Sequence, residues 1–299
     1  MGSISVVINT LNEEKNIERA ISSISDFADE IIVCDMNSDD KTSELASKMG
    51  AKIYKHKRVG YVEPARNFAI AKAKSDWVLV LDADEEIGIE LSNKLKEISN
   101  QNDVDYVRIA RKNIIFNKWI KHSFWWPDYN IRFFRKNHVV WDDAIHGIPI
   151  TSGVGTDLQT TEDFSIIHHE YQTVEQFIDR LNRYTTIQAK NLTYSGKHFL
   201  WRDLIIKPTQ EFCRRYFSEE GYKDGIHGLA LSLLQAFSEV VLYCKLWQNS
   251  KFENKQIPFD DFSSTFKKSI SEIAYWIANV EIAQKANFIS RIKRKLKIL

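Results

Sequence analysis

Trp77-Val78-Leu79-Val80-Leu81-Asp82-Ala83-Asp84 is the stretch that decides the fold of this chain. Its five apolar residues indicate a buried strand, and the run ends abruptly in two acids that are one residue apart. Two carboxylates at the carboxyl end of such a strand suit a divalent cation, which can then bridge to a diphosphate. Short acidic triplets are common, so this prediction depends on the elements that surround the stretch.

Strand and helix patterns alternate around this stretch. Apolar runs predict strands at Ile4–Asn9, Glu30–Cys34, Ala51–Tyr54, Trp77–Leu81 and Tyr106–Arg111. The helices predicted between them cover residues 17–24, 42–49, 64–73 and 91–98. This alternation predicts an α/β fold with a parallel sheet covered on both faces, and ligands bind beyond the carboxyl ends of the strands in such sheets.

Polar residues follow three of the predicted strands: Asn9-Thr10, Asp35 and Asp82-Ala83-Asp84. Because the carboxyl ends of parallel strands share one edge of a sheet, we expect these groups on one rim. Asp35 is suited to accept a hydrogen bond from a ribose hydroxyl or a base N–H, and Arg66 is placed to reach a base or phosphates. A turn or helix cap for Asp35 and a surface position for Arg66 remain open alternatives.

The sequence changes in character after residue 112. Residues 113–141 are rich in aromatic side chains, and short strands are predicted at Asn130–Phe134 and Ser165–His168. The segment Thr173–Gln176 fits a capping box, and the chain has helical patterns from there to its end. The further helices are predicted at Phe199–Phe217, Gly228–Trp247, Phe262–Gln284 and Phe288–Leu299. We therefore expect a domain over 1–170, with halves 1–112 and 113–170, and a helical region over 171–299.

Composition and charge limit the function classes. The 299 residues carry 41 Lys and Arg against 40 Asp and Glu, a net charge of +1, so no nucleic acid partner is expected. Three scattered cysteines without metal-ligand spacing are typical of a reduced, cytoplasmic protein. The chain begins directly with a strand-like run, so no signal peptide is expected. The apolar stretch Leu229–Trp247 contains too many polar residues to predict a membrane span.

Several segments occur in the order and spacing of family 2 glycosyltransferases. They are Asn9–Glu14, Asp29–Thr42, Ala65–Ala69 and Leu81–Glu85. Later segments make the chain similar to one bacterial branch, the lipopolysaccharide core β-glucosyltransferase-like enzymes. These are Pro127–Arg135, Ile145-His146, Ile166–His168, Asn182–Thr185, Arg214–Phe217, Gly221–Gly225 and Gly228-Leu229. The resemblance extends to about Trp247, and no motif in it identifies the sugar.

This resemblance implies a GT-A fold, a nucleotide-sugar donor that we expect to be a UDP-sugar, and an inverting transfer to a lipid-linked or cell-surface glycan. Position by position it implies these nucleotide-sugar-binding residues: Thr10, Asn12, Glu13, Asp35, Ser38, Arg66, Asp82 and Ala83. It also implies that Asp84, together with Asp82, holds Mn²⁺ or Mg²⁺. Such a cation neutralises the leaving diphosphate and acts as its Lewis acid.

An inverting transfer also needs a base within reach of the acceptor hydroxyl. The candidates are Asp142, Asp143, His146 and, more remotely, Asp128. Where the branch commonly reads His-Glu, this chain has His146-Gly147, so no carboxylate is available there and Asp143 is a possible substitute. His146 is alternatively a metal or phosphate ligand, or a structural histidine. A ligand role and a structural role are likewise both open for His168-His169.

The acceptor-binding candidates are Trp125, Trp126, Asp128 and Arg132. Tryptophan rings suit the apolar faces of sugars, and Trp125-Trp126 is the best stacking pair of the aromatic segment 119–141. The same aromatic residues are equally suited to form the seam between two halves of the molecule.

The C-terminal third favours contact with a membrane. Residues 289, 292, 296 and 299 are Ile or Leu and share one helical face, and six cations lie between Lys285 and Lys297 with no acid after Glu281. Together with the apolar and basic range Phe199–Phe217, this predicts a peripheral enzyme on the inner face of the cytoplasmic membrane, bound through basic amphipathic helices. The alternative is a solvated basic tail.

Two rival functions remain. A nucleotidyltransferase also places acids over a nucleotide, but it would need a Gly-rich loop after the first strand, where this chain has Thr10-Leu11-Asn12-Glu13-Glu14. A non-catalytic sugar-nucleotide-binding protein is disfavoured by the intact pair of Asp82 and Asp84, and the sequence His146-Gly147 leaves it open.

Overall fold

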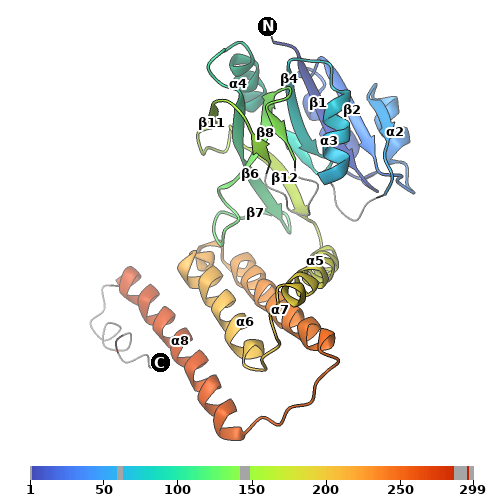
Figure 1. The fold of residues 1–299 in the computed structure, drawn as a ribbon. Helices are drawn as coiled ribbons and strands as arrows, with labels where there is room; N and C mark the ends of the chain where they lie inside the picture. The colour runs from blue at the N-terminus through green and yellow to red at the C-terminus, as the bar shows by residue number, and fades with distance from the viewer. Residues whose placement is uncertain (1, 59–62, 142–148, 286–294, 296–299) are drawn as a thin grey trace. The chain divides into compact units, whose positions relative to one another are not determined.

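The computed structural model of the chain describes all residues except 1, 59–62, 142–148, 286–294 and 296–299. The chain forms two compact units (Figure 1). The sheet unit contains Met1–Ile114 and Trp126–Glu170, and the helical unit contains Ile115–Trp125 and Tyr171–Leu299. Each unit is described by itself.

The sheet unit is built on one mixed sheet with the strand order β3-β2-β1-β4-β8-β6-β12-β5. The strands are β1 (Ile4–Thr10), β2 (Glu30–Asp35), β3 (Lys52–Lys55), β4 (Trp77–Asp82), β5 (Glu85–Ile87), β6 (Tyr106–Ile115), β8 (Asp128–Arg135) and β12 (Ile166–Tyr171). Shorter strands of this unit are β9 (Val139–Val140), β10 (Ile150–Thr151) and β11 (Gly155–Asp157), while β7 (Lys118–Trp119) belongs to the helical unit.

The expectation of a parallel sheet is right for only part of it. The strands β3, β2, β1 and β4 are parallel neighbours. The next strand, β8, runs antiparallel to both β4 and β6, so it separates the predicted strand β6 from the parallel series. At the far edge, β12 and β5 also pair antiparallel.

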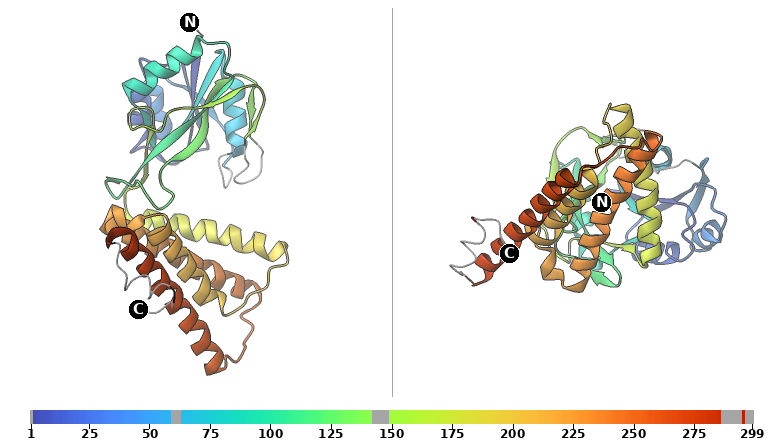
Figure 2. Two further views of the ribbon diagram at one scale, coloured as in Figure 1. Left: turned by 90° about the vertical axis from the view of Figure 1, so that its left-hand side faces the viewer. Right: turned by 90° about the horizontal axis from the view of Figure 1, so that it is seen from below.

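Helices cover both faces of the parallel part of the sheet, as expected (Figures 1 and 2). These helices are α1 (Ile17–Ile24), α2 (Thr42–Lys48), α3 (Glu63–Lys72) and α4 (Ile89–Ser99). Alternate residues of β4 point to opposite faces. Thus Leu79 packs in the core with α1 and α4, while Val78 and Val80 pack in the core with α3. Burial on both faces explains why β1 and β4 are continuous apolar runs.

The helical unit contains α5 (Val174–Tyr194), α6 (Asp203–Cys213), α7 (Ile226–Asn249) and α8 (Phe259–Lys285). The predicted capping box of α5 is confirmed, since the Thr173 side chain accepts from the Gln176 N–H and the Gln176 side chain accepts in return. The predicted helix at Phe199–Phe217 begins later, at Asp203, and α6 continues directly into a π-helical turn, η1 (Arg214–Ser218). A 3₁₀ turn, η2 (Gly221–Asp224), follows. The predicted helix Phe288–Leu299 lies outside the described residues.

The helix α7 contacts α5 on one side and α6 on another, and α6 in turn contacts α8. By length and composition α7 is apolar enough to cross a membrane, although one such helix is weak evidence for a span. Its residues Leu231, Leu242 and Leu246 are buried against other helices of the unit. We therefore describe α7 as a packed helix of this unit.

Candidate active site

The carboxyl ends of β1, β2 and β4 meet at one edge of the sheet. In the strand register, Thr10 lies beside Asp35 and Asn9 lies beside Asp82. The predicted rim of polar groups is therefore confirmed as an arrangement. The side chains of Asn9 and Thr10 are buried there, and their polar atoms have no hydrogen-bond partner among the residues that the structure describes. Buried polar groups of this kind are rare in native proteins, and a bound ligand or water at the rim would complete their hydrogen bonding.

Asp82 is held by two arginines that come from different elements. Arg66 of α3 donates to its Oδ1 at 2.8 Å, and Arg132 of β8 donates to its Oδ2 at 2.7 Å. Arg132 also donates to Glu85 at 2.7 Å, and the other oxygen of Glu85 accepts from the Asp82 backbone N–H at 2.9 Å. The turn that follows β4 is therefore fixed from three sides before any ligand arrives.

Charge pairing dominates the ionisation of this group. Burial by itself would raise the pKa of Asp82, but Arg132 and Arg66 outweigh burial and hold that pKa well below its ordinary value. Burial would lower the pKa of Arg132, and Asp82 and Glu85 raise it instead. Asp82 is thus a permanently charged member of an ion-pair network, to which Arg111 of β6 adds contacts with Glu85 and Asp128.

Asp84 has different surroundings. Its Oδ2 lies 3.5 Å from Nε2 of His168, and the Nδ1 of His168 lies 2.7 Å from Oδ1 of Asn113. Because the Asn113 oxygen accepts from Nδ1, the Nε2 edge of the ring is turned toward Asp84. Burial would lower the pKa of His168, but the Asp84 carboxylate raises it above its ordinary value. The structure thus favours a site role for His168, whereas His169 pairs with Glu86 at 2.8 Å.

A divalent cation fits this arrangement. Asp84 offers a carboxylate oxygen and His168 an imidazole nitrogen, which are donors that Mn²⁺ accepts, and Mg²⁺ favours the oxygen. Among the described residues no group of three or more His, Cys, Asp or Glu is suited to hold a metal ion. Such a cation would therefore depend on oxygens of the substrate, as is usual where cations bind diphosphates.

The loops that follow β1 and β2 are connected by side-chain hydrogen bonds. Oδ1 of Asp35 accepts from the backbone N–H of Ser38 at 3.0 Å, and Oγ of Ser38 accepts from the Asn12 N–H at 2.9 Å. Oδ1 of Asn12 accepts in return from the Asp39 N–H at 2.8 Å. The predicted nucleotide residues Asn12, Asp35 and Ser38 are therefore brought together, and the turn role foreseen for Asp35 is also present.

Glu13 follows Asn12 in the chain and interacts electrostatically with nearby aspartates. Burial, together with the charges of Asp84, Asp40 and Asp82, raises the pKa of Glu13 to about 7 although Asn16 donates to it. Burial is the largest cause of this raised pKa, and the three aspartates add a smaller electrostatic contribution. Ala83, between the two aspartates, is buried in the apolar core, so its backbone is the part that faces the rim.

The neighbouring Arg66-Asn67 pair on α3 engages Trp141. The Arg66 guanidinium lies over the Trp141 ring, 5.3 Å from its centroid. The Asn67 side chain accepts from the Trp141 backbone N–H at 2.9 Å and donates to its C=O at 2.6 Å. Trp141 directly precedes the predicted base candidates Asp142, Asp143 and His146, which lie outside the described residues.

The acceptor-binding predictions are placed differently from expectation. Arg132 was expected to bind an acceptor; it is buried and contacts Asp82 and Glu85, which is a positioning role, and acceptor binding by it stays a prediction. Asp128 accepts from Arg111 and Asn130. Trp125 belongs to the helical unit, where it packs edge-on to Tyr171 at 6.4 Å, and Trp126 belongs to the sheet unit. Sugar stacking by these two residues stays a prediction.

Sequence reasoning placed Asn9 on the rim but missed three contributors to the site: Glu85, Arg111 and Asn113. Glu85 and Arg111 lie in short polar segments without the hydrophobic periodicity of a helix or a strand. Asn113 lies in the aromatic segment after the last predicted strand of the alternating series. Their roles depend on contacts across β6, β8 and β12, which no local pattern encodes.

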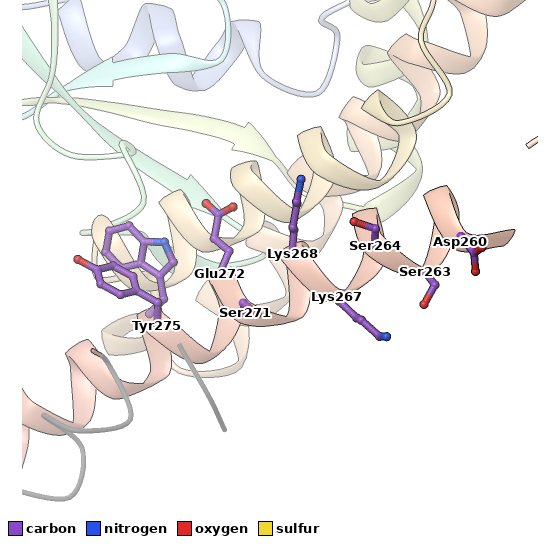
Figure 3. A pocket seen from close by; sticks show the side chains of 9 residues that line it. Asp260, Ser263, Ser264, Lys267, Lys268, Ser271, Glu272 and Tyr275 are labelled. Atoms are coloured by element: carbon purple, nitrogen blue, oxygen red, sulfur yellow. The ribbon is translucent and has the colours of Figure 1, made fainter. Parts of the chain in front are cut away.

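One surface hollow belongs to the helical unit. It measures about 940 Å³ and is lined by residues of α8, among them Lys267, Lys268 and Glu272 (Figure 3). These side chains form the polar face of a single helix, and no strand-end acid contributes to the hollow. The rim of the sheet unit is therefore the candidate active site.

A covered α/β sheet with paired acids at a central strand end, followed by a helical region, defines a glycosyltransferase of the GT-A fold. The Glycosyl transferase family 2 profile matches residues 5–154, which is half of the chain. This chain belongs to glycosyl transferase family 2, and the family and fold class predicted from the sequence are confirmed.

Two relatives that match over most of the chain agree with this assignment, and a partial match to a solved structure is given after them. The chain is 30% identical over 271 residues to an uncharacterized glycosyltransferase of Rickettsia typhi, covering 88% of this chain and 92% of the relative. It is 26% identical over 255 residues to the lipopolysaccharide core biosynthesis glycosyltransferase LpsC of Rhizobium meliloti, covering 82% and 92%. A solved structure, glucosyl-3-phosphoglycerate synthase from Mycobacterium tuberculosis with Mn²⁺ and UDP, matches at 28% identity with a TM-score of 0.33, covering 37% of this chain and 44% of the other.

Proposed function

We propose that this glycosyltransferase moves a hexose from a UDP-sugar to a lipid-linked or lipopolysaccharide glycan, with inversion and with Mn²⁺ or Mg²⁺. The observation that carries the proposal is that the two aspartates at the end of β4 have different surroundings. Asp82 is neutralised by Arg66 and Arg132, whereas Asp84 is presented next to His168. The name of the LpsC relative supports the lipopolysaccharide acceptor.

The residues of this chain have separate parts in the reaction. Asp35, Ser38 and Asn12 form the wall suited to a base and ribose, and the unpartnered Thr10 hydroxyl lies beside Asp35 in the register. Asp84 and His168 are the residues that would hold the cation, which supplies charge neutralisation for the leaving diphosphate.

The acceptor hydroxyl must lose a proton as it attacks from the face opposite the leaving group. We assign this base to the segment of Asp142, Asp143 and His146. The support is its position in the motif order of the branch and the clamp of Asn67 on Trp141, the residue before the segment.

Location is part of the proposal. We place the enzyme on the inner face of the cytoplasmic membrane, since the C-terminal segment combines six cations with an apolar stripe. A lipid-linked acceptor would be available there.

The test is transfer and hydrolysis of UDP-sugars by purified protein with and without Mn²⁺. Asp84→Ala should abolish transfer and weaken UDP binding measured in the presence of Mn²⁺. The matched control is Asp157→Ala, which removes an exposed acid paired with Arg108 on β6 of the same unit. Normal turnover by the Asp84→Ala protein would refute the assignment of the cation site.

A further inference from the structure

The helix α8 presents large apolar side chains to solvent in its first half. Phe259, Phe262, Phe266 and Ile270 are 77%, 39%, 48% and 41% exposed. Their spacing of three, four and four residues places them on one face of the helix. The rings of Phe262 and Phe266 are stacked with centroids 5.8 Å apart. We call this set the α8 stripe.

The packing of α8 is inverted relative to an ordinary amphipathic helix. The residues that are buried in the same half are Thr265 and Ser269, which carry small hydroxyl side chains. An ordinary surface helix of a globular protein buries its large apolar face and exposes its polar face. The α8 stripe is therefore built for an environment other than water or the core of this unit.

Further exposed apolar residues lie in the two connections near the start of α8. Leu200 precedes α6, while Phe252 and Ile257 lie between α7 and α8, and all three are exposed. Phe199 stacks on Trp247, which in turn contacts Phe252, so the two connections lie together. Arg202 at the start of α6 pairs with Asp261 in the first turn of α8. The stripe thus continues into a wider apolar surface.

Charge identifies the occupant of this surface. The helical unit contains 22 Lys and Arg against 13 Asp and Glu, an excess of nine positive charges, whereas the sheet unit has 19 against 27, an excess of eight negative charges. Lys267 is exposed next to the stripe, while Lys268 is exposed on the far side of the helix and points the opposite way in Figure 3. The sequence after α8 adds further cations and no acid. Exposed apolar rings on a unit with this excess of cations suit an anionic lipid surface, although Asp260 and Asp261 lie between Phe259 and Phe262, and like charge of the unit opposes its pairing with a second copy.

We propose that the α8 stripe is the surface by which this enzyme docks on an anionic lipid bilayer, with its phenylalanine rings entering the interface and Lys267 facing the headgroups. This deepens the membrane location proposed above and rests on it. It assigns the membrane contact to helix α8 in addition to the basic segment after residue 285.

The test is co-sedimentation of full-length protein with vesicles of phosphatidylcholine, with and without phosphatidylglycerol, at low and high salt. The variant Phe262→Ser/Phe266→Ser should lose at least tenfold in affinity for the anionic vesicles. Because both side chains are exposed, its melting temperature should match that of the wild type. The matched control is Ile89→Ser/Val154→Ser, which removes two exposed apolar side chains of the sheet unit and should bind as the wild type does.

The outcomes separate the surface from the location. If the wild type binds anionic vesicles and the phenylalanine variant binds equally well, the stripe is not the contact, although the membrane location stands. If the wild type ignores all vesicles, the membrane location fails with it, while transfer from UDP-sugar remains a separate measurement. A wild-type dimer that the same variant dissociates, without lipid binding, would identify a second copy as the occupant and overturn the proposal.

Discussion

Replacing Arg132 with Met tests whether the ion-pair network at the end of β4 positions the site. Arg132 is 4% exposed, and it donates to Asp82 and to Glu85, whose side chain is fully buried. Removing one partner of a buried ion pair costs about 3–5 kcal/mol, because the remaining charge stays buried without compensation. Arg66 still reaches Asp82 at 2.8 Å and Arg111 lies 3.6 Å from Glu85, so we expect the lower end, about 3 kcal/mol.

The assay is urea unfolding followed by intrinsic tryptophan fluorescence, which the buried Trp77 on β4 makes sensitive to the sheet unit. The matched control is Arg108→Met, since Arg108 and Asp157 form a pair in which both side chains are about half exposed. Exposed pairs contribute about 0–1 kcal/mol, so the control should shift the midpoint little. Equal, small shifts for Arg132→Met and Arg108→Met would show that the network does not carry the stability assigned to it.

Three further predictions concern pH, the base and the basic tail. Because the pKa of Glu13 is raised to about 7 in the folded protein against 4.5 as its ordinary value, the folded state binds the extra proton and stability is lost as the pH rises from 4.5 to 7. In urea unfolding, the free energy of unfolding of Glu13→Gln should therefore exceed that of the wild type by roughly 1–3 kcal/mol at pH 8 and by little at pH 4. A difference that is the same at both pH values would contradict this. Asp143→Asn should keep donor binding and lower transfer by roughly 10²-fold or more in a steady-state assay, whereas full activity of both Asp143→Asn and Asp142→Asn would move the base elsewhere. Deleting residues 286–299 should shift the protein to the soluble fraction and spare donor hydrolysis, and an unchanged membrane fraction would leave the tail as a solvated end.

The parallel part of the fold could be predicted because its signal is local. The strands β1 and β4 are buried on both faces, so each is a continuous apolar run that ends where the polar rim begins. The strand β5 was missed, since Glu85–Ile87 contains two acids and pairs with β12, which lies about eighty residues later in the chain. The antiparallel position of β8 between β4 and β6 is likewise determined by tertiary packing, and the hydrophobic periodicity of the sequence does not predict it.

The site could be predicted where strand ends carry polar groups and not where the fold buries charge. Asp35, Asp82 and Asp84 were found because each follows an apolar run. Arg132 was placed on the acceptor side because it lies in a polar stretch of β8, but its position opposite two acids depends on the pairing of β8 with β4. His168 was left undecided, and the pairing of β12 with β5 is what brings it to Asp84.

The charge pattern of the rim itself separates structural acids from a ligand acid. Asp82, Glu85 and Asp128 are each within reach of a guanidinium, so their charges are largely neutralised by the fold. The contact described for Asp84 is with an imidazole whose pKa it raises, and the same carboxylate helps to raise the pKa of Glu13. The arginines therefore neutralise the other three acids but leave a negative potential beside Asp84. A cation placed there would stabilise both Asp84 and an ionised Glu13, which is the electrostatic reason to assign the ligand role to the second aspartate of the pair and the positioning role to the first.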